Sequence, residues 1–489
     1  MAARRYRFNR REVAGQLMGM EVGDLLPELI VLVGGVFVLL YALFAPSRLQ
    51  DLAPWIALVV VAGAFAASIE MLLAGPETLI FFDTYSTDAT AVWGKLIVLT
   101  ATAAVVVFSA PWFRTDPRRG EYYTLLLFSA LGAILLAGAT DLMELVMAIL
   151  VSSASGYVLA AYHRTSRPAS EAAMKYFLLG ALTNAGMLMG VALLFGLAGT
   201  TTFMGLREGL APGGTAVVGG AALVIAALAF KMGSVPVHQW MPDLADGAPA
   251  PVAAFITVAP KVGGLIALAR FVMVLPETEV GWRPLVAVLA AVTMSLGNLA
   301  ALWQTDVRRL LGWSAVSQTG YGLMGVVALG RTDLAVPSIL FFLAAYVLAN
   351  VAAFGVVVEL RGRAALDQYR GLARARPLLA AVLVVAFLSF IGIPPLAGFD
   401  AKLALFAVAI DANYSWLAGL AVVNTVVSIA YYARVMAPMY FDGLPSPEPV
   451  PVLGAGAAAA TVACAAGVIV AGIWAEPLFR SFMDAGLLP

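Results

Sequence analysis

The chain has 489 residues, of which 62% are hydrophobic and 12% are charged, and its formal net charge is zero. A soluble domain of this length carries roughly twice that charged fraction, and without an excess of basic residues nothing indicates nucleic-acid binding. The single cysteine, Cys464, lies in a run of alanine and valine, which excludes an iron–sulfur cluster or a CxxC redox site within this chain.

Apolar stretches of about 20 residues, each long enough to cross the hydrocarbon core of a bilayer, recur along the whole sequence. They predict an all-α integral membrane protein with about fourteen transmembrane spans. No cleavable signal peptide is evident before the first span. The predicted spans are 24–45, 52–74, 92–112, 121–139, 141–162, 170–197, 213–232, 250–274, 284–303, 308–329, 335–359, 378–410, 412–438 and 452–475.

The distribution of arginine predicts which side of the membrane each loop faces. Arginines gather in alternate loops, at Arg48, 114–119, 164–167, 308–309 and 361–376. Basic loops stay in the cytoplasm, which puts both termini on the outer side. The five arginines before residue 12 contradict this placement, so either the tail is tolerated outside or the natural start lies at Met18 or Met20. The alanine- and arginine-rich composition favours a bacterial plasma (inner) membrane.

Lysine is rare, and all five lysines fall inside predicted spans: Lys95, Lys175, Lys231, Lys261 and Lys402. A desolvated lysine changes its protonation state readily, whereas arginine stays charged. Lysines within a membrane therefore indicate a proton path. Lys95 and Lys175 stand near the starts of their spans and could instead reach the membrane interface. Lys231, Lys261 and Lys402 lie deeper or beside helix breaks, and we predict that they carry protons.

Proline is predicted to interrupt two spans close to these lysines. Pro236 follows Lys231 in KMGSVPVHQW, and Pro394 and Pro395 precede Lys402 in IGIPPLAGFDAK. Proline removes a backbone donor and clashes with the preceding turn, and irregular backbone persists at membrane depth only where protein or water satisfies it. His238, just beyond the first break, has an unperturbed pKa suited to proton exchange, and we predict that it relays protons.

Interrupted helices at corresponding points of two halves are typical of transporters with internal repeats and an ion site at the membrane midplane. We predict two inverted five-helix repeats, spans 4–8 and 9–13, with the breaks in spans 7 and 12. The chain then divides into residues 1–120 (three spans and a basic tail), 121–275 (first repeat), 276–440 (second repeat) and 441–489 (last span). No metal-binding pattern and no glycine-rich dinucleotide loop is apparent.

Several long motifs occur in order along the chain, among them FKMGSVPVHQWMPDLADGAPAPVAAFITVAPKVGG, ALWQTDVRRLLGWSAVSQTGYGLMG and LSFIGIPPLAGFDAKLALF. In these motifs the sequence resembles the antiporter-like membrane subunits of respiratory complex I, an NADH:quinone oxidoreductase, from about residue 80 to 441. It is most similar to the N type, because AAMKYFLLGA contains Lys175 and position 402 is lysine rather than glutamate. No long lateral helix follows the last span, which also favours the N type.

The resemblance implies a proton channel of two linked half-channels, joined along the midplane by charged residues and water and coupled to quinone reduction elsewhere in the complex. By motif, Lys231, Lys261 and Lys402 are its lysines, and Lys175 is the additional N-type lysine. The resemblance implies no redox centre or cofactor in this chain; flavin, iron–sulfur clusters and quinone belong to partner subunits. The implied partners are other antiporter-like and small membrane subunits, the peripheral redox arm and membrane lipid.

One position departs from the family pattern. The resemblance implies a glutamate in the fifth span, where this sequence has Leu150; the nearest carboxylate is Glu144, six residues earlier. Three interpretations follow: Glu144 compensates through another path, a neighbouring subunit supplies the acid, or the chain is mainly a scaffold whose channel has decayed. A Mrp-type sodium/proton antiporter, or a ferredoxin- or hydrogenase-linked relative of complex I, would use a very similar subunit.

Overall fold

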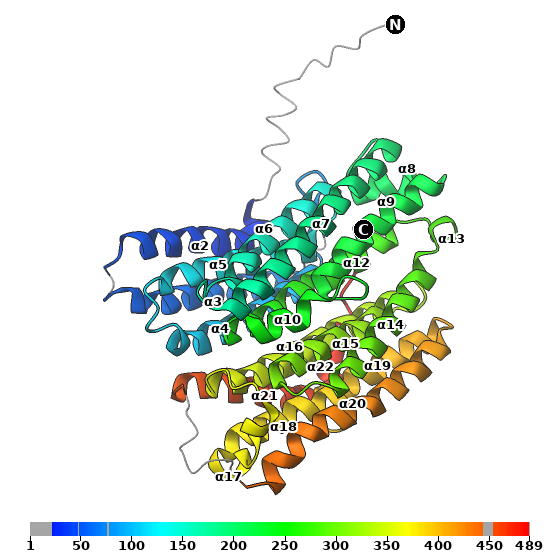
Figure 1. Ribbon diagram of the computed structural model, residues 1–489. Coiled ribbons are helices and arrows are strands. Elements are labelled where there is room, and N and C mark those ends of the chain that lie inside the picture. Colours follow the sequence, from blue (N-terminus) through cyan, green and yellow to red (C-terminus); the bar gives the residue numbers. More distant parts are fainter. Residues whose placement is uncertain (1–21, 47, 76–77, 444–452, 489) are drawn as a thin grey trace, which may run out of the picture.

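The computed structural model describes residues 22–46, 48–75, 78–443 and 453–488. Most of them form helices, and the long helices run in roughly one direction (Figure 1). The basic N-terminal tail, with the two candidate starts Met18 and Met20, lies outside the described residues.

The part of the chain before the first predicted repeat contains three long helices and a hairpin. The short 3-10 helices are η1 (Val22–Leu25) and η2 (Gln50–Leu52). The strands β1 (Leu79–Ile80) and β2 (Tyr85–Ser86) pair antiparallel, with Leu79 opposite Ser86 and Ile80 opposite Tyr85. The long helices are α2 (Leu26–Phe44), α3 (Ala53–Ala74) and α4 (Ala89–Trp112).

Eight described helices follow in the region of the first predicted repeat, and two more begin the second. The eight are α5 (Arg119–Gly138), α6 (Leu142–Ala160), α7 (Arg167–Ala198), α8 (Phe203–Gly209), α9 (Thr215–Met232), α10 (Trp240–Gly247), α11 (Ala250–Ile256) and α12 (Ala259–Met273). The second predicted repeat begins with α13 (Glu277–Val280) and α14 (Trp282–Leu302).

The remaining elements complete the second predicted repeat and the C-terminal part. They are α15 (Val307–Val327), α16 (Ala335–Glu359), η3 (Leu366–Tyr369), α17 (Leu372–Ala375), α18 (Pro377–Ile391), α19 (Ala397–Asp411), α20 (Ser415–Phe441), α21 (Ala455–Ile473) and α22 (Ala475–Ser481).

Helix ends coincide with the capping residues that helices prefer. Asp88, Asp141 and Asp306 stand at the N-caps of α4, α6 and α15, and their carboxylates accept backbone N–H groups of the first turn. Glycines with positive φ end α3, α7 and α9, where a left-handed residue closes the last turn. These caps fix the helix boundaries within a few residues of the predicted spans.

Twelve spans in the described part of the chain are long and apolar enough to cross a membrane, so this is a multi-pass membrane protein. The other two predicted spans correspond to α15, whose sequence is more polar, and to the pair α18 and α19, each of which has 15 residues. The arrangement of fourteen spans in two inverted repeats stays a prediction.

The structure contains a third interruption that the sequence did not predict. From the sequence we predicted a continuous span over 250–274. The structure instead has α11 and α12, separated at Thr257 and Val258. Pro260 explains the break: it has no N–H to donate to the carbonyl four residues earlier. The hydroxyl of Thr257 donates back to Ala253 O at 2.8 Å and closes the last turn of α11.

The core lies where the two halves meet. Within an 18-residue stretch of each span, all residues of the span formed by α11 and α12 and 89% of those of α16 are buried, whereas in the spans of α3 and α21 the buried share is 33%. In Figure 1 the green helices α9–α12 lie beside the yellow-green α14–α16, with the orange α20 farther out. The predicted proton carriers therefore belong to the most enclosed part of the bundle.

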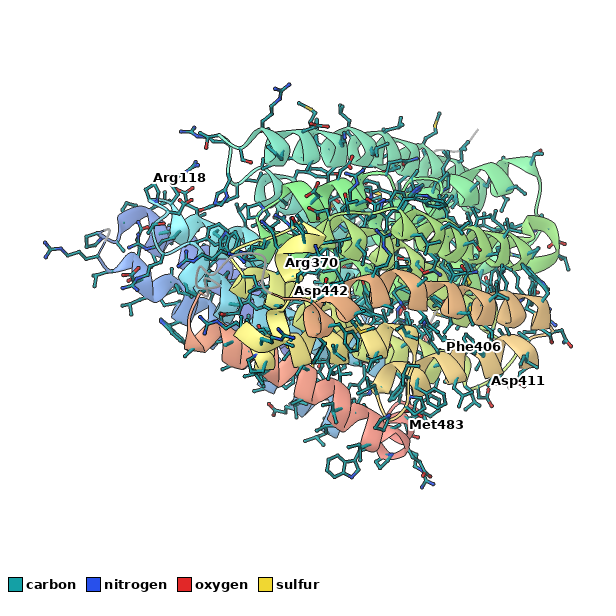
Figure 2. The ribbon with its side chains drawn as sticks, turned by 60° about the horizontal axis from the view of Figure 1, so that its bottom comes forward. Arg118, Arg370, Phe406, Asp411, Asp442 and Met483 are labelled. Atoms are coloured by element: carbon teal, nitrogen blue, oxygen red, sulfur yellow. The ribbon has the colours of Figure 1, made fainter. Side chains whose placement is uncertain are left out.

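Loops that we predicted on the same side of the membrane lie at the same end of the bundle. Isolated bridges join Tyr85 to Ala139 and Asp141 to Thr202, all in or directly beside loops predicted outside, and Asp306 to Ala365, both in loops predicted cytoplasmic. Figure 2 shows Arg118 and Arg370 toward one end of the helices and Asp411 and Met483 toward the other. Which end faces the cytoplasm stays a prediction.

Candidate functional site

The first predicted break begins where α9 ends. Gly233, with φ +72°, closes the helix, and residues 233–239 run without regular structure to α10. Carbonyls freed by the break find donors elsewhere: Trp240 Nε1 donates to Phe230 O at 3.1 Å, and Thr319 Oγ1 donates to Met232 O at 2.8 Å. Such partners are what irregular backbone at membrane depth needs.

Lys231 stands in the last turn of α9 and is 1% exposed. Its ammonium group donates to Ser153 Oγ on α6 at 3.0 Å. Gly264 on α12 faces the same side chain, since a Cβ built there would lie 3.5 Å from Lys231 Cγ. The break therefore lets a lysine reach the bundle interior between α6, α9 and α12.

The second break separates α18 from α19. Gly392, with φ +91°, ends α18, and Pro394 and Pro395 lie in the irregular segment that follows. Lys402 on α19 is 4% exposed and folds back on this end: Nζ donates to Phe390 O at 2.6 Å and lies 3.4 Å from Ile391 O. A cation at a helix C-terminus meets the negative end of the helix dipole.

Lys261 lies between the two breaks, at the start of α12, and is 2% exposed. Its ammonium group donates to Ala315 O at 2.6 Å and to the phenol oxygen of Tyr346 at 3.1 Å. The same nitrogen lies 4.6 Å from the centre of the Tyr346 ring, a geometry in which the ring face stabilises a cation. The interruption before α12 places Lys261 at the centre of the molecule.

Polar side chains lie near the three lysines. Thr319 Oγ1 lies 2.8 Å from Met232 O, beside Lys231, and 3.1 Å from Ala315 O, the acceptor of Lys261. On the other side of Lys261, Tyr346 lines a small cavity that Lys402 also lines. Its volume of ≈ 10 Å³ is near the smallest that holds one water molecule.

We call Lys231, Thr319, Lys261, Tyr346 and Lys402 the lysine row. Gln318 supports its far end, because its Nε2 donates to Phe390 O at 3.3 Å, the carbonyl that also accepts from Lys402. Within the described part of the chain, no carboxylate lies within 4.0 Å of any of the three ammonium groups. Such amines can hold or release a proton as the surrounding charges change.

The resemblance implies a glutamate beside Lys231, but the structure has no carboxylate in contact with this lysine among the described residues. Leu150 stands one helical turn before Ser153 on α6 and is 40% exposed, so this position lies at the edge of the face that contacts Lys231. Glu144 precedes Ser153 by nine residues, about 13 Å along a helix axis, and is half-buried at the start of α6. The structure therefore keeps Glu144 away from Lys231.

The structure places Lys175 apart from the row. Its side chain is 45% exposed and pairs with Glu171 at 2.8 Å and with Asp243 at 2.7 Å; Asp243 also pairs with Arg309 at 2.6 Å. This exposed network joins α7, α10 and α15.

His238 lies in the first break and is 6% exposed, with its ring centre 5.5 Å from that of Trp313. Its Nδ1 has no hydrogen-bond partner among the described residues. A buried ring nitrogen without a partner is free to accept a proton or a water, so the position suits a relay without placing His238 in contact with the row.

For Lys95, the alternative of a place at the membrane interface does not fit the structure, which buries the side chain completely on α4 and pairs it with Glu28. The polar partners of the lysines were not predicted from the sequence: Ser153, Thr319, Tyr321 and Tyr346. All four lie in predicted spans, and the centre of the Tyr321 ring lies 4.0 Å from Lys402 Nζ. The sequence did contain a signal for them, since a hydroxyl group within a membrane span needs a hydrogen-bond partner.

The chain is similar to known proteins along most of its length. The family model described as "NADH:quinone oxidoreductase/Mrp antiporter, TM" matches residues 139–428. Among curated relatives, NADH-quinone oxidoreductase subunit N of Mycobacterium sp. (strain JLS) is 44% identical over 82% of this chain and 86% of its own. The subunit N 1 of Streptomyces griseus is 41% identical over 86% of this chain and 90% of its own.

Solved structures share the fold. A chain of respiratory complex I from Thermus thermophilus is 30% identical, with a TM-score of 0.79 over 94% of this chain and 100% of that one. A chain of the Mrp complex from Dietzia sp. is 22% identical, with a TM-score of 0.83 over 95% of this chain and 97% of that one, which shows the fold alone.

Proposed function

Because the chain belongs to the NADH:quinone oxidoreductase/Mrp antiporter family of membrane subunits, as the resemblance indicated, we propose that it is the proton-translocating, antiporter-like subunit of an NADH:quinone oxidoreductase. Its curated relatives are named as subunit N of that complex. In this proposal the chain moves protons, and quinone reduction occurs elsewhere in the complex.

The observation that carries the proposal is the lysine row. Three lysines, each at most 4% exposed, stand at or near three helix interruptions. Thr319 lies between the backbone beside Lys231 and the acceptor of Lys261, and Tyr346 contacts Lys261 and lines a small cavity with Lys402. Burying a charge at membrane depth is costly and marks ion and proton pathways. Protons pass along the row when each amine gains one from its neighbour on one side and gives one to the other.

The rest of the complex supplies what this chain is expected to lack. We place flavin, iron–sulfur clusters and quinone in partner subunits, and other antiporter-like subunits, small membrane subunits and lipid around this chain. The peripheral redox arm connects to it through the complex. The proposed location is a bacterial inner membrane, with both termini on the outer side and the arginine-rich loops in the cytoplasm.

Two other functions have support from particular observations. The fold shared with the Mrp complex favours a sodium/proton antiporter subunit as the second candidate; a ferredoxin- or hydrogenase-linked relative of complex I would use the same row. Leu150 favours a scaffold with a decayed channel, because no acid faces Lys231.

The proposal is tested by Lys231→Ala in the purified complex, reconstituted into vesicles. We expect strongly reduced proton pumping at unchanged assembly, with Glu70→Gln on the exposed face of α3 as a matched control that leaves pumping intact. An unchanged proton-to-electron ratio in Lys231→Ala would favour the scaffold, and sodium-dependent exchange without co-purifying redox subunits would favour the antiporter.

A further inference from the structure

A second buried charged cluster lies away from the lysine row, at the end of the bundle that holds the β1–β2 hairpin. Lys95 Nζ on α4 lies 2.7 Å from Glu28 Oε1 on α2, and the two side chains are 0% and 5% exposed. The phenol of Tyr85 on β2 donates to the same carboxylate oxygen at 2.5 Å. The ammonium nitrogen lies 5.3 Å from the centre of the Tyr85 ring.

A neighbouring buried ion pair shows what a purely structural pair looks like here. Arg270 on α12 binds Asp88 through two hydrogen bonds of 2.6 and 2.7 Å. The guanidinium also donates to Ala137 O and Leu488 O, and Asp88 accepts the N–H groups of Ala91 and Leu488. Arginine does not release its proton, and these bonds hold the pair in one arrangement.

The Glu28–Lys95 pair is held less completely. Among the described residues, Glu28 Oε2 has no hydrogen-bond partner, and Lys95 Nζ has no partner besides its ion pair with Oε1. Leaving buried charged atoms unpaired is costly. Buried polar atoms without protein partners are places where a proton or an ordered water binds. Inside the protein, Glu28 Oε2 can therefore accept a further hydrogen bond, and Lys95 Nζ can donate further ones.

Charged groups on neighbouring elements face this cluster. Glu144 at the start of α6 interacts electrostatically with both Glu28 and Tyr85, and Arg270 interacts with Tyr85. Glu144 is half-buried and belongs to the end of α6 next to the loop that pairs with β2. Glu144 is therefore a partly exposed acid that interacts with the buried pair.

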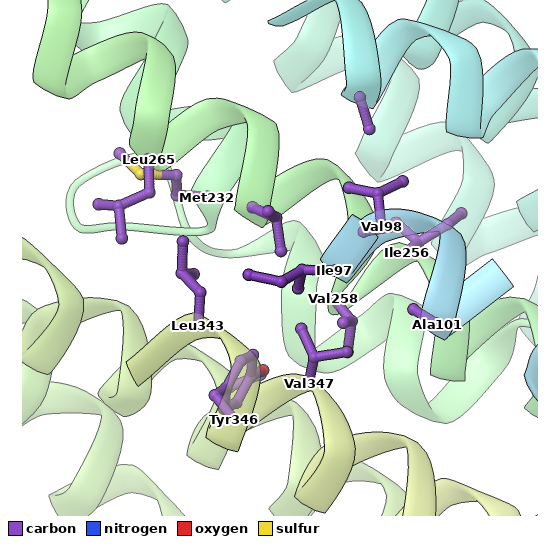
Figure 3. Close-up of a cluster of buried hydrophobic side chains, with 14 of the residues drawn as sticks. Ile97, Val98, Ala101, Met232, Ile256, Val258, Leu265, Leu343, Tyr346 and Val347 are labelled. Carbon is purple, nitrogen blue, oxygen red and sulfur yellow. The ribbon is translucent and has the colours of Figure 1, made fainter. Parts of the chain in front are cut away.

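Apolar side chains follow Lys95 along α4. Ile97 and Val98 belong to the apolar cluster of Figure 3, in which Ile97 lies close to Val258. Glu144 interacts electrostatically with Glu28, whereas the residues that directly follow Lys95 on α4 are apolar.

We propose that Glu28, Lys95 and Tyr85 form a second proton-exchange site in this chain, an inference that rests on the proposed function of the subunit. A proton from water forms an O–H bond at Glu28 Oε2, which turns the ion pair into a carboxylic acid beside an ammonium ion and adds one positive charge. Release breaks that bond and returns the proton to water on the Glu144 side. Across a low-dielectric region, the added charge repels protons on the lysine row.

Infrared difference spectroscopy of the purified complex between two pH values measures this step directly, because a protonated carboxyl group has its own carbonyl band. We expect that band in the unaltered complex and its loss in Glu28→Gln. Removing one partner of a buried pair can prevent folding, so the double variant Glu28→Gln/Lys95→Met, which removes both charges, decides the question if the single variant fails to assemble. Glu70→Gln keeps the band.

Proton pumping by the same samples supplies the second readout. We expect the double variant to lose the same share of the proton-to-electron ratio as Lys231→Ala. If the difference spectrum of the double variant matches that of the unaltered complex, the proposed proton-exchange site is wrong. Loss of the band together with an unchanged ratio in Lys231→Ala supports the site and contradicts the proposed function, so the two failures are distinguishable.

Discussion

Lys231 and Lys402 contact the two proline breaks in different ways. In the first, Lys231 precedes the break, other residues satisfy the freed carbonyls, and the ammonium group contacts only a hydroxyl across the interface with α6. In the second, Lys402 follows the break and itself donates to the last carbonyls of α18. The difference indicates that Lys231 has few contacts, whereas Lys402 stabilises the irregular segment of its break.

The largest difference between the halves is expected in Lys402→Met compared with Lys231→Met. Both should abolish proton transfer through this subunit, but Lys402→Met also removes a charged donor from buried carbonyls, which costs about 1–3 kcal/mol. Thermal unfolding of the purified complex should therefore begin at lower temperature in Lys402→Met. Equal unfolding temperatures in the two variants would contradict the stabilising role of Lys402 at its break.

Thr319→Val tests the connection between the halves, because Thr319 lies between the end of α9 and the acceptor of Lys261. Valine has the same shape but leaves Met232 O without this donor, so we expect a several-fold fall in pumping and a loss of about 1 kcal/mol in stability. Thr319→Ser retains the hydroxyl and should pump normally. If serine and valine behaved alike, the hydroxyl would have no role.

The smallest effect is expected from restoring an acid to the first half. Leu150→Glu places a carboxylate one helical turn from Ser153, within reach of Lys231, and should change the pH dependence of turnover while leaving assembly intact. Leu150→Gln has the same size without the charge and should follow the pH dependence of the unaltered complex. A matching change in the glutamine variant would mean that size, and not charge, matters at this position.

The sequence was sufficient to predict the membrane class, most helix bounds, both proline breaks and the three buried lysines, because hydropathy and proline act locally along the chain. It could not predict the partners. Ser153 meets Lys231 across 78 positions of sequence, and Tyr346 meets Lys261 across 85. Lys95 shows the same limit: the sequence left open whether it reaches the interface, whereas the structure buries it and pairs it with Glu28, which lies 67 positions earlier. Such pairings depend on tertiary packing.

The central claim is that Lys231, Lys261 and Lys402 act as one path, and the proton-to-electron ratio of single and double variants tests it most directly. If the lysines act in series, Lys231→Met, Lys261→Met and Lys402→Met each remove the same share of pumping, and the double variant Lys231→Met/Lys402→Met removes no more than either single change. Losses that add in the double variant would contradict a single path.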